Sequence, residues 1–249
     1  DRPRVDDAGA STALVVVDVV GVFLRRGRGR RVHDGASSGQ HRAVADVMVV
    51  AAWVLRVVGE LGYGDGITLA RLSPLVEHYR VLEGAESLVR KVRAEHPQVD
   101  VLHQLFEQHQ VDQPYDRVLA LHVLEHVDDP VSLLRHMAGW MGPDSEMIIV
   151  VPNRESLHRR LAVLMGLQPE LDTLSARDKV VGHQRVYDLA GLTADLQAGG
   201  FEVIESKGFF LKTLPNSMML DYSDALIAGL NDVGEQLPAE LLANLAVRV

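Results

Sequence analysis

The chain alternates short apolar runs with longer segments that carry apolar residues at helical spacing. Runs of strand length occupy residues 54–58, 99–102, 115–121, 147–151 and 201–204. Nearly continuous apolar runs of this kind are typical of parallel strands that are buried on both faces. Strands that alternate with helices form a parallel sheet covered by helices, so the pattern predicts an α/β fold.

Helix signals lie between these runs. We expect helices over residues 67–79, 87–96, 130–140, 154–166 and 188–199, and one over 43–53 before the first strand. Ser87 is the predicted N-cap of its helix, and Pro97 ends that helix. Asp129 followed by Pro130 places a capping side chain before a proline at the first helical position. Residues 168–182 are polar and rich in helix breakers, which predicts a loop.

The most informative stretch runs from residue 54 to residue 83. It contains a strand, a glycine-rich turn, a helix, and a second strand that ends in Glu83. Glycine adopts positive φ and lets a ligand approach the backbone closely. Glu83 follows the turn at close to the roughly twenty residues expected of an acid that binds a ribose. The stretch is therefore typical of a nucleotide-binding half of a Rossmann-like sheet.

The charge of this turn indicates which nucleotide it binds. Dinucleotide enzymes typically carry G-x-G-x-x-G with the pyrophosphate at a helix N-terminus. Here the spacing is acid-x-G-x-G-x-G, and Glu60 and Asp65 add negative charge. That charge disfavours a diphosphate and favours S-adenosylmethionine, which carries a sulfonium and an ammonium and no phosphate.

With these motifs the chain resembles the class I S-adenosylmethionine-dependent methyltransferases, nearest to their ubiquinone-pathway-like, small-molecule branch. The resemblance runs from about residue 54 to the C-terminus and includes the string HVLEHVDDP at residues 122–130. It implies a Rossmann-like, doubly wound sheet of seven strands, mostly parallel with an antiparallel last strand, and helices on both faces. It also implies S-adenosylmethionine as cofactor and S-adenosylhomocysteine as product. Because the sequence shows no internal repeat and no linker, we expect a single domain over residues 46–249.

The cofactor site is predicted from the glycine turn and the strand ends. In the resembling family the turn at residues 105–107 holds the adenine, although Phe106 is equally compatible with ordinary core packing. The predicted cofactor-binding residues are Glu60, Gly62, Tyr63, Gly64, Gly66, Glu83, Gly84, Phe106, Glu107 and His122.

Three histidines are the candidate catalytic residues. Methyl transfer needs mainly the alignment of nucleophile, methyl group and sulfur, because the sulfonium is already activated. An oxygen or nitrogen nucleophile must still lose a proton, and histidine titrates near neutral pH. We predict His122, His126 and His183 for this role, while each could instead be structural.

Metal chemistry is the alternative for the same histidines. His122-x-x-Glu125-His126 matches the string of inverted zincins, but it begins at the end of a strand and not inside a helix. Small-RNA 2′-O-methyltransferases and some ubiquinone-pathway enzymes carry E-x-x-E-H after this strand and bind a divalent cation. His122 replaces their first glutamate, which shifts preference away from Mg²⁺. We therefore expect no metal, with a metal-dependent 2′-O-methyltransferase-like enzyme as an alternative.

Composition narrows the class of protein. The 249 residues, 47% of them hydrophobic, suit one α/β domain. A net charge of −9 argues against a nucleic-acid partner, and the lack of cysteine excludes disulfides and thiolate metal sites. No apolar run approaches the ~20 residues of a membrane span. We expect a cytoplasmic protein that acts on a small molecule, without a membrane partner, as a monomer or homodimer.

Two segments outside the core motif carry further expectations. Residues 1–45 include a basic run at 25–31. We expect either a solvated or disordered segment, an anion-binding or RNA-contacting arm, or the lid that caps the cofactor in the resembling family. A helical insert at about 217–236 precedes the expected last strand over 242–249. Its apolar face could pack on the cofactor domain or on a second subunit, and our hypothesis is that it lines the acceptor pocket together with Phe209 and Phe210.

Two function classes remain open. The first is an enzyme that methylates an oxygen, nitrogen or carbon atom of a metabolite. The second is a non-catalytic S-adenosylmethionine-binding or regulatory protein with the same fold. The glycine turn and Glu83 favour the first class.

Overall fold

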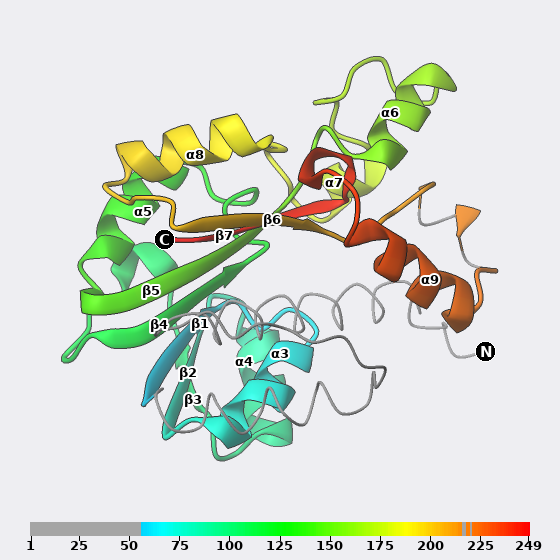
Figure 1. The fold of residues 1–249 in the computed structure, drawn as a ribbon. Coiled ribbons are helices and arrows are strands. Elements are labelled where there is room, and N and C mark those ends of the chain that lie inside the picture. The colour runs from blue at the N-terminus through cyan, green and yellow to red at the C-terminus, as the bar shows by residue number, and fades with distance from the viewer. Residues whose placement is uncertain (1–55, 216–217, 220) are drawn as a thin grey trace, which may run out of the picture.

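The computed structural model describes residues 56–215, 218–219 and 221–249. Within them, a seven-stranded sheet has the order β3-β2-β1-β4-β5-β7-β6 (Figure 1). Only β7 runs antiparallel to its neighbours β5 and β6, and the other pairs are parallel. The predicted Rossmann-like fold class is confirmed. The strands are β1 Val57–Leu61, β2 His78–Glu83, β3 Asp100–His103, β4 Tyr115–Leu121, β5 Met141–Pro152, β6 Glu205–Phe209 and β7 Asn244–Arg248.

Helices cover both faces of the sheet, because alternate residues of each buried strand point to opposite sides. In β5, Ile148 and Val150 pack into a cluster with α3 and α4, whereas Ile149 and Val151 pack with α5 and α8. Figure 1 shows α5 and α8 lying side by side. The helices are α3 Ile67–Leu72, α4 Glu86–Glu95, α5 Pro130–Ala138, α6 Leu157–Leu164, α7 Ala176–Val180, α8 Leu189–Ala198 and α9 Asp224–Gly234.

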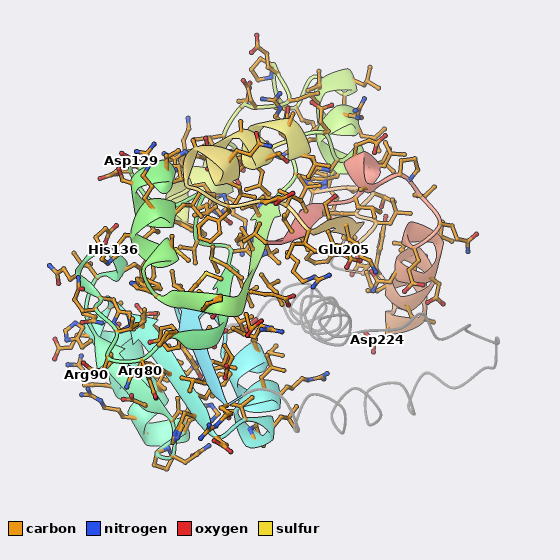
Figure 2. All side chains as sticks on the ribbon, turned by 60° about the vertical axis from the view of Figure 1, so that its left-hand side comes forward. Arg80, Arg90, Asp129, His136, Glu205 and Asp224 are labelled. Carbon is orange, nitrogen blue, oxygen red and sulfur yellow. The ribbon has the colours of Figure 1, made fainter. Side chains whose placement is uncertain are left out.

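The bounds or the N-caps of several elements were predicted correctly from residues close together in the sequence. β4 has the predicted bounds, and the side chain of Asp129 caps α5 by accepting a hydrogen bond from the backbone N–H of Ser132. Figure 2 labels Asp129 at the start of this helix and His136 further along it. The predicted helix over 188–199 is observed as α8, with Asp188 as its N-cap.

Other predicted bounds were wrong. The helix expected to reach residue 79 ends at Leu72, because Ser73–Leu75 form a 3₁₀ turn around Pro74 and β2 starts at His78. Ser87 is not an N-cap, since α4 begins one residue earlier, after Ala85. The strand predicted over 147–151 is longer in the structure, because β5 already begins at Met141.

The remaining differences between prediction and structure lie at the ends of two strands and in one loop. β1 extends to Leu61, so that Glu60 belongs to the strand and not to the turn. The sixth strand was predicted over 201–204, but β6 starts at Glu205, where pairing with Arg248 of β7 sets the register. The predicted loop over 168–182 contains α7, which begins with a capping box at Ser175.

The predicted insert forms α9 between β6 and β7. Phe209, Phe210 and Met219 are buried in the core cluster that includes Ile148, and Leu226 of α9 is exposed. These aromatic side chains therefore pack within the domain. The segment 1–45 and the predicted helix over 43–53 lie outside the described residues. Within the described part, no helix is long and apolar enough to cross a membrane.

Candidate active site at the carboxyl edge of the sheet

The glycine turn connects β1 to α3 at the edge where the parallel strands end. Gly62, Gly64 and Gly66 have φ of 76°, 55° and 80°, the left-handed region that favours glycine. A Cβ built at Gly62 or Gly64 would meet no atom within 4 Å, whereas one at Gly66 would collide with the Tyr63 ring. The first two glycines thus leave the backbone open to a ligand, and the third permits close internal packing.

Tyr63 packs away from this open side. Its side chain is buried, its hydroxyl donates to Glu95 Oε2 at 2.9 Å, and Lys91 Nζ lies 5.1 Å from the ring centroid. Both partners belong to α4. A cofactor contact from Tyr63 would therefore come from its backbone.

Glu83 ends β2 and holds the glycine turn in place. The residue is 8% exposed, and its carboxylate accepts from the Tyr63 N–H through Oε2 at 3.0 Å and from the Ala85 N–H through Oε1 at 2.7 Å. Each carboxylate oxygen can accept two hydrogen bonds. One acceptor position on each oxygen is left for the hydroxyl groups of a ribose.

Glu60 does not lie in the glycine turn, as the sequence predicted, but in strand β1. It is buried beside Tyr79, whose hydroxyl donates to Glu60 Oε2 at 2.9 Å, and burial raises the pKa of Glu60 to about 8. Ionisation of this carboxyl group is therefore disfavoured. A cation bound beside it would favour the ionised form.

The predicted adenine turn is a 3₁₀ turn over Phe106–Gln108 after β3. Phe106 packs against the core, Glu107 is exposed, and Gly84 is exposed after β2. Leu105 is 56% exposed, and a Cβ at Gly84 would lie 3.3 Å from its side chain. Leu105, rather than Phe106, thus offers the apolar surface beside Gly84.

His122 follows β4, the neighbour of β1 in the sheet. Its φ of 58° is unusual for a residue other than glycine and indicates local strain. His122 Nδ1 lies 3.0 Å from Glu125 Oε1, and Glu125 is fully buried. Among the described residues, none forms a hydrogen bond with the other oxygen, Glu125 Oε2.

His126 and His183 meet at the same edge from distant parts of the chain. Their ring centroids lie 4.7 Å apart in an edge-to-face arrangement, and burial lowers the pKa of His126. The segment after α7 is held there because the Gln184 N–H donates to the Glu125 carbonyl at 2.7 Å, and Arg185 donates to the Leu124 carbonyl at 2.8 Å. The structure therefore brings all three predicted histidines to one edge of the sheet.

Asp178 orients His183, a contact that sequence reasoning missed. His183 Nδ1 lies 2.9 Å from Asp178 Oδ1, and Asp178 Oδ2 accepts from Arg159 at 3.0 Å and from the Ser175 N–H at 2.8 Å. Burial opposes ionisation of Asp178, but the hydrogen bonds from His183 and Ser175 and the charge of Arg159 outweigh it and lower the pKa of Asp178. In the sequence, the only indication of the Asp178–His183 pair is the spacing D-x-x-x-x-H.

Glu125, His126 and His183 also form a group able to hold a metal ion. Each offers one ligand atom, and these atoms all lie within 4.8 Å of one another. His122, the fourth ligand that the sequence suggested, is not part of this group within the described residues.

Comparison with known proteins identifies the family. The model of a family described as "Methyltransferase domain" matches residues 55–206, more than half of the chain. The chain belongs to this methyltransferase family. The predicted resemblance to the class I S-adenosylmethionine-dependent methyltransferases is confirmed, and S-adenosylmethionine is the methyl donor of such enzymes. No curated protein matches the sequence.

Solved structures of methyltransferases share the fold. An S-adenosylmethionine-dependent methyltransferase from Mesorhizobium loti is 15% identical with a TM-score of 0.55, over 78% of this chain and 89% of that one. One from Archaeoglobus fulgidus is 18% identical with a TM-score of 0.52, over 85% and 94% of the two chains. One from Clostridium acetobutylicum ATCC 824 is 10% identical with a TM-score of 0.53, over 82% and 88%.

Proposed function

We propose that this methyltransferase transfers the methyl group of S-adenosylmethionine to an oxygen, nitrogen or carbon nucleophile of a small molecule. The observation that carries the proposal is the placement of the glycine turn and the histidines at one sheet edge. Gly62 follows β1, His122 follows the adjacent β4, and His183 lies against His126. In open α/β sheets, ligands bind outside the carboxyl ends of the strands.

The residues at the turn fit the methyl donor. Glu83 would accept the ribose hydroxyls through its remaining lone pairs, and Glu60 and Gly62 would lie near the amino-acid end. Leu105, Gly84 and the 3₁₀ turn after β3 would flank the adenine. When bound, S-adenosylmethionine supplies a methyl group already activated on a sulfonium. The protein then has to align the acceptor and exclude water.

A histidine would take the acceptor proton. The hydrogen bond from His183 Nδ1–H to Asp178 fixes the imidazole tautomer, an assignment that follows from the bonding partners. His183 Nε2 is then left with a lone pair and can accept a proton. His122 and His126 stand at the same edge and complete the set of candidate bases.

Replacing His183 by asparagine should lower turnover by about 10²–10⁴-fold, the usual contribution of a general base. Titration with S-adenosylhomocysteine should give an affinity within about twofold of the parent. The measurement is S-adenosylhomocysteine release with an acceptor found in a metabolite panel. His78→Asn, at the exposed start of β2, is the matched control. Unchanged turnover in H183N would remove His183 from the mechanism, and cofactor binding without turnover on any acceptor would favour the non-catalytic alternative.

A metal-dependent, 2′-O-methyltransferase-like reaction is the second candidate, favoured by the Glu125, His126 and His183 group. A set of one carboxylate and two imidazoles suits Zn²⁺ or a similar ion better than Mg²⁺. The first candidate predicts full activity in the presence of a chelator. Activity that EDTA abolishes and a divalent ion restores would instead establish the second.

A further inference from the structure

The loop between β4 and α5 carries two of the three candidate histidines. We call residues 122–128 the histidine loop; it contains His122 and His126 and consists of turns and bends. A loop of this kind lacks the regular hydrogen-bond partners of a helix or strand, so its buried backbone groups need other partners. Here those partners come from a segment that follows α7 and runs from His183 to Tyr187.

Two adjacent residues of that segment donate hydrogen bonds to the carbonyls of residues 124–128. The backbone N–H of Gln184 donates to the Glu125 carbonyl at 2.7 Å, and its side-chain amide donates to the His126 carbonyl at 2.6 Å. Gln184 is exposed, so water competes for the bonds of its side chain. The carbonyls of residues 124, 127 and 128 have Arg185 as their donor.

Arg185 brings three carbonyls of the histidine loop to one guanidinium group. Its Nη1 donates to the Leu124 carbonyl at 2.8 Å and also to the Val127 carbonyl, and its Nη2 donates to the Asp128 carbonyl at 3.1 Å. A guanidinium presents its donors in a planar fork, whereas a lysine ammonium is a compact point charge. Because a buried carbonyl without a donor is costly, loss of this fork would shift the loop towards other partners.

Two other contacts hold the same segment, and these bonds do not involve the histidine loop. On one side, His183 is bonded to Asp178 at 2.9 Å. On the other side, the Arg154 N–H at the end of β5 donates to the Tyr187 carbonyl at 2.7 Å. Replacing Arg185 would therefore leave the segment attached at both ends, and the fold should survive the change.

We propose that Arg185 is a positioning residue for methyl transfer, which holds His183 against His126. The two ring centroids lie 4.7 Å apart, and Arg185 binds carbonyls of the histidine loop on both sides of His126. Arg185 acts through His183 and not on the acceptor itself. This inference rests on the proposed function, because there His183 is the candidate base. A displacement of about 1 Å at a reacting group can lower a rate by about 10²-fold.

The first measurement needs neither cofactor nor acceptor. In the full chain with ¹³C-labelled histidine, the rings of His126 and His183 should give a nuclear Overhauser cross-peak. We expect Arg185→Lys, which keeps the charge but loses the fork, to remove this cross-peak. Arg135→Lys is the matched control and should keep it, because Arg135 of α5 donates to the Ala198 carbonyl at 3.1 Å, away from the histidine loop.

The second measurement is turnover with an acceptor found in the metabolite panel. We expect R185M to lower kcat by about 10²-fold and R185K by about tenfold, with S-adenosylhomocysteine affinity within about twofold of the parent. The double variant R185M/H183N should match H183N within about twofold, because a residue that acts through His183 has nothing to position once that imidazole is gone. A residue that only supports the fold would slow both backgrounds by the same factor.

The outcomes separate the two proposals. If the cross-peak is absent from the parent or persists in R185K, or if R185M slows the parent and H183N equally, the positioning role is refuted while the proposed function stands. If the parent fails to bind S-adenosylhomocysteine at all, the proposed function fails and the role of Arg185 in methyl transfer fails with it.

Discussion

Replacing Glu83 by alanine should weaken S-adenosylhomocysteine binding by about tenfold to a hundredfold or more. A hydrogen bond to a charged group contributes about 1.5–3 kcal/mol, and 1.4 kcal/mol corresponds to about a factor of ten in affinity. The variant would lose the acceptor for the ribose and also the two backbone hydrogen bonds from Tyr63 and Ala85 that hold the turn. Isothermal titration measures the change.

Two further variants make this result interpretable. Glu86→Ala removes an exposed carboxylate of α4 that pairs with Arg90, and it should leave affinity unchanged. Glu83→Gln keeps one oxygen as an acceptor and should lie between the parent and E83A. Equal affinities of E83A and E86A would show that the ribose does not bind at Glu83.

Gly66→Ala should be the most destabilising single change in the glycine turn. A residue other than glycine in the left-handed region costs about 1–3 kcal/mol, and here the new Cβ would also collide with the Tyr63 ring. Gly64→Ala is the matched control, because its φ is also positive but its Cβ would meet open space. Urea unfolding of the two variants gives the difference in the free energy of unfolding.

A double-mutant cycle isolates the contribution of the ring. In a Tyr63→Ala background, Gly66→Ala should cost less, and its cost should approach that of Gly64→Ala. If G66A and G64A are equally stable in the parent background, the Tyr63 ring adds nothing to the cost of a Cβ at residue 66.

The sequence alone determined the features that depend on neighbouring residues. β4 was predicted with its observed bounds because a strand buried on both faces leaves a nearly continuous apolar run. The cap of α5 was predicted because Asp129 and Pro130 act within one helical turn. The positive φ values of the glycine turn follow from residue type, since glycine adopts them at little cost. These local motifs also identified the family.

Tertiary structure decided those features that require partners distant in the sequence. The start of β6 depends on its register with β7, and α3 is short because β2 must begin in line with β1. The raised pKa of Glu60 is a consequence of its burial.

The acceptor side of the site depends on the fold most of all. Asp178 is placed by Arg159 and Ser175, and His183 meets His126 because Gln184 and Arg185 are hydrogen-bonded to the carbonyls of Glu125 and Leu124. Burial and contacts between distant segments set the chemistry of these side chains, and a pattern of residue types along the chain records neither.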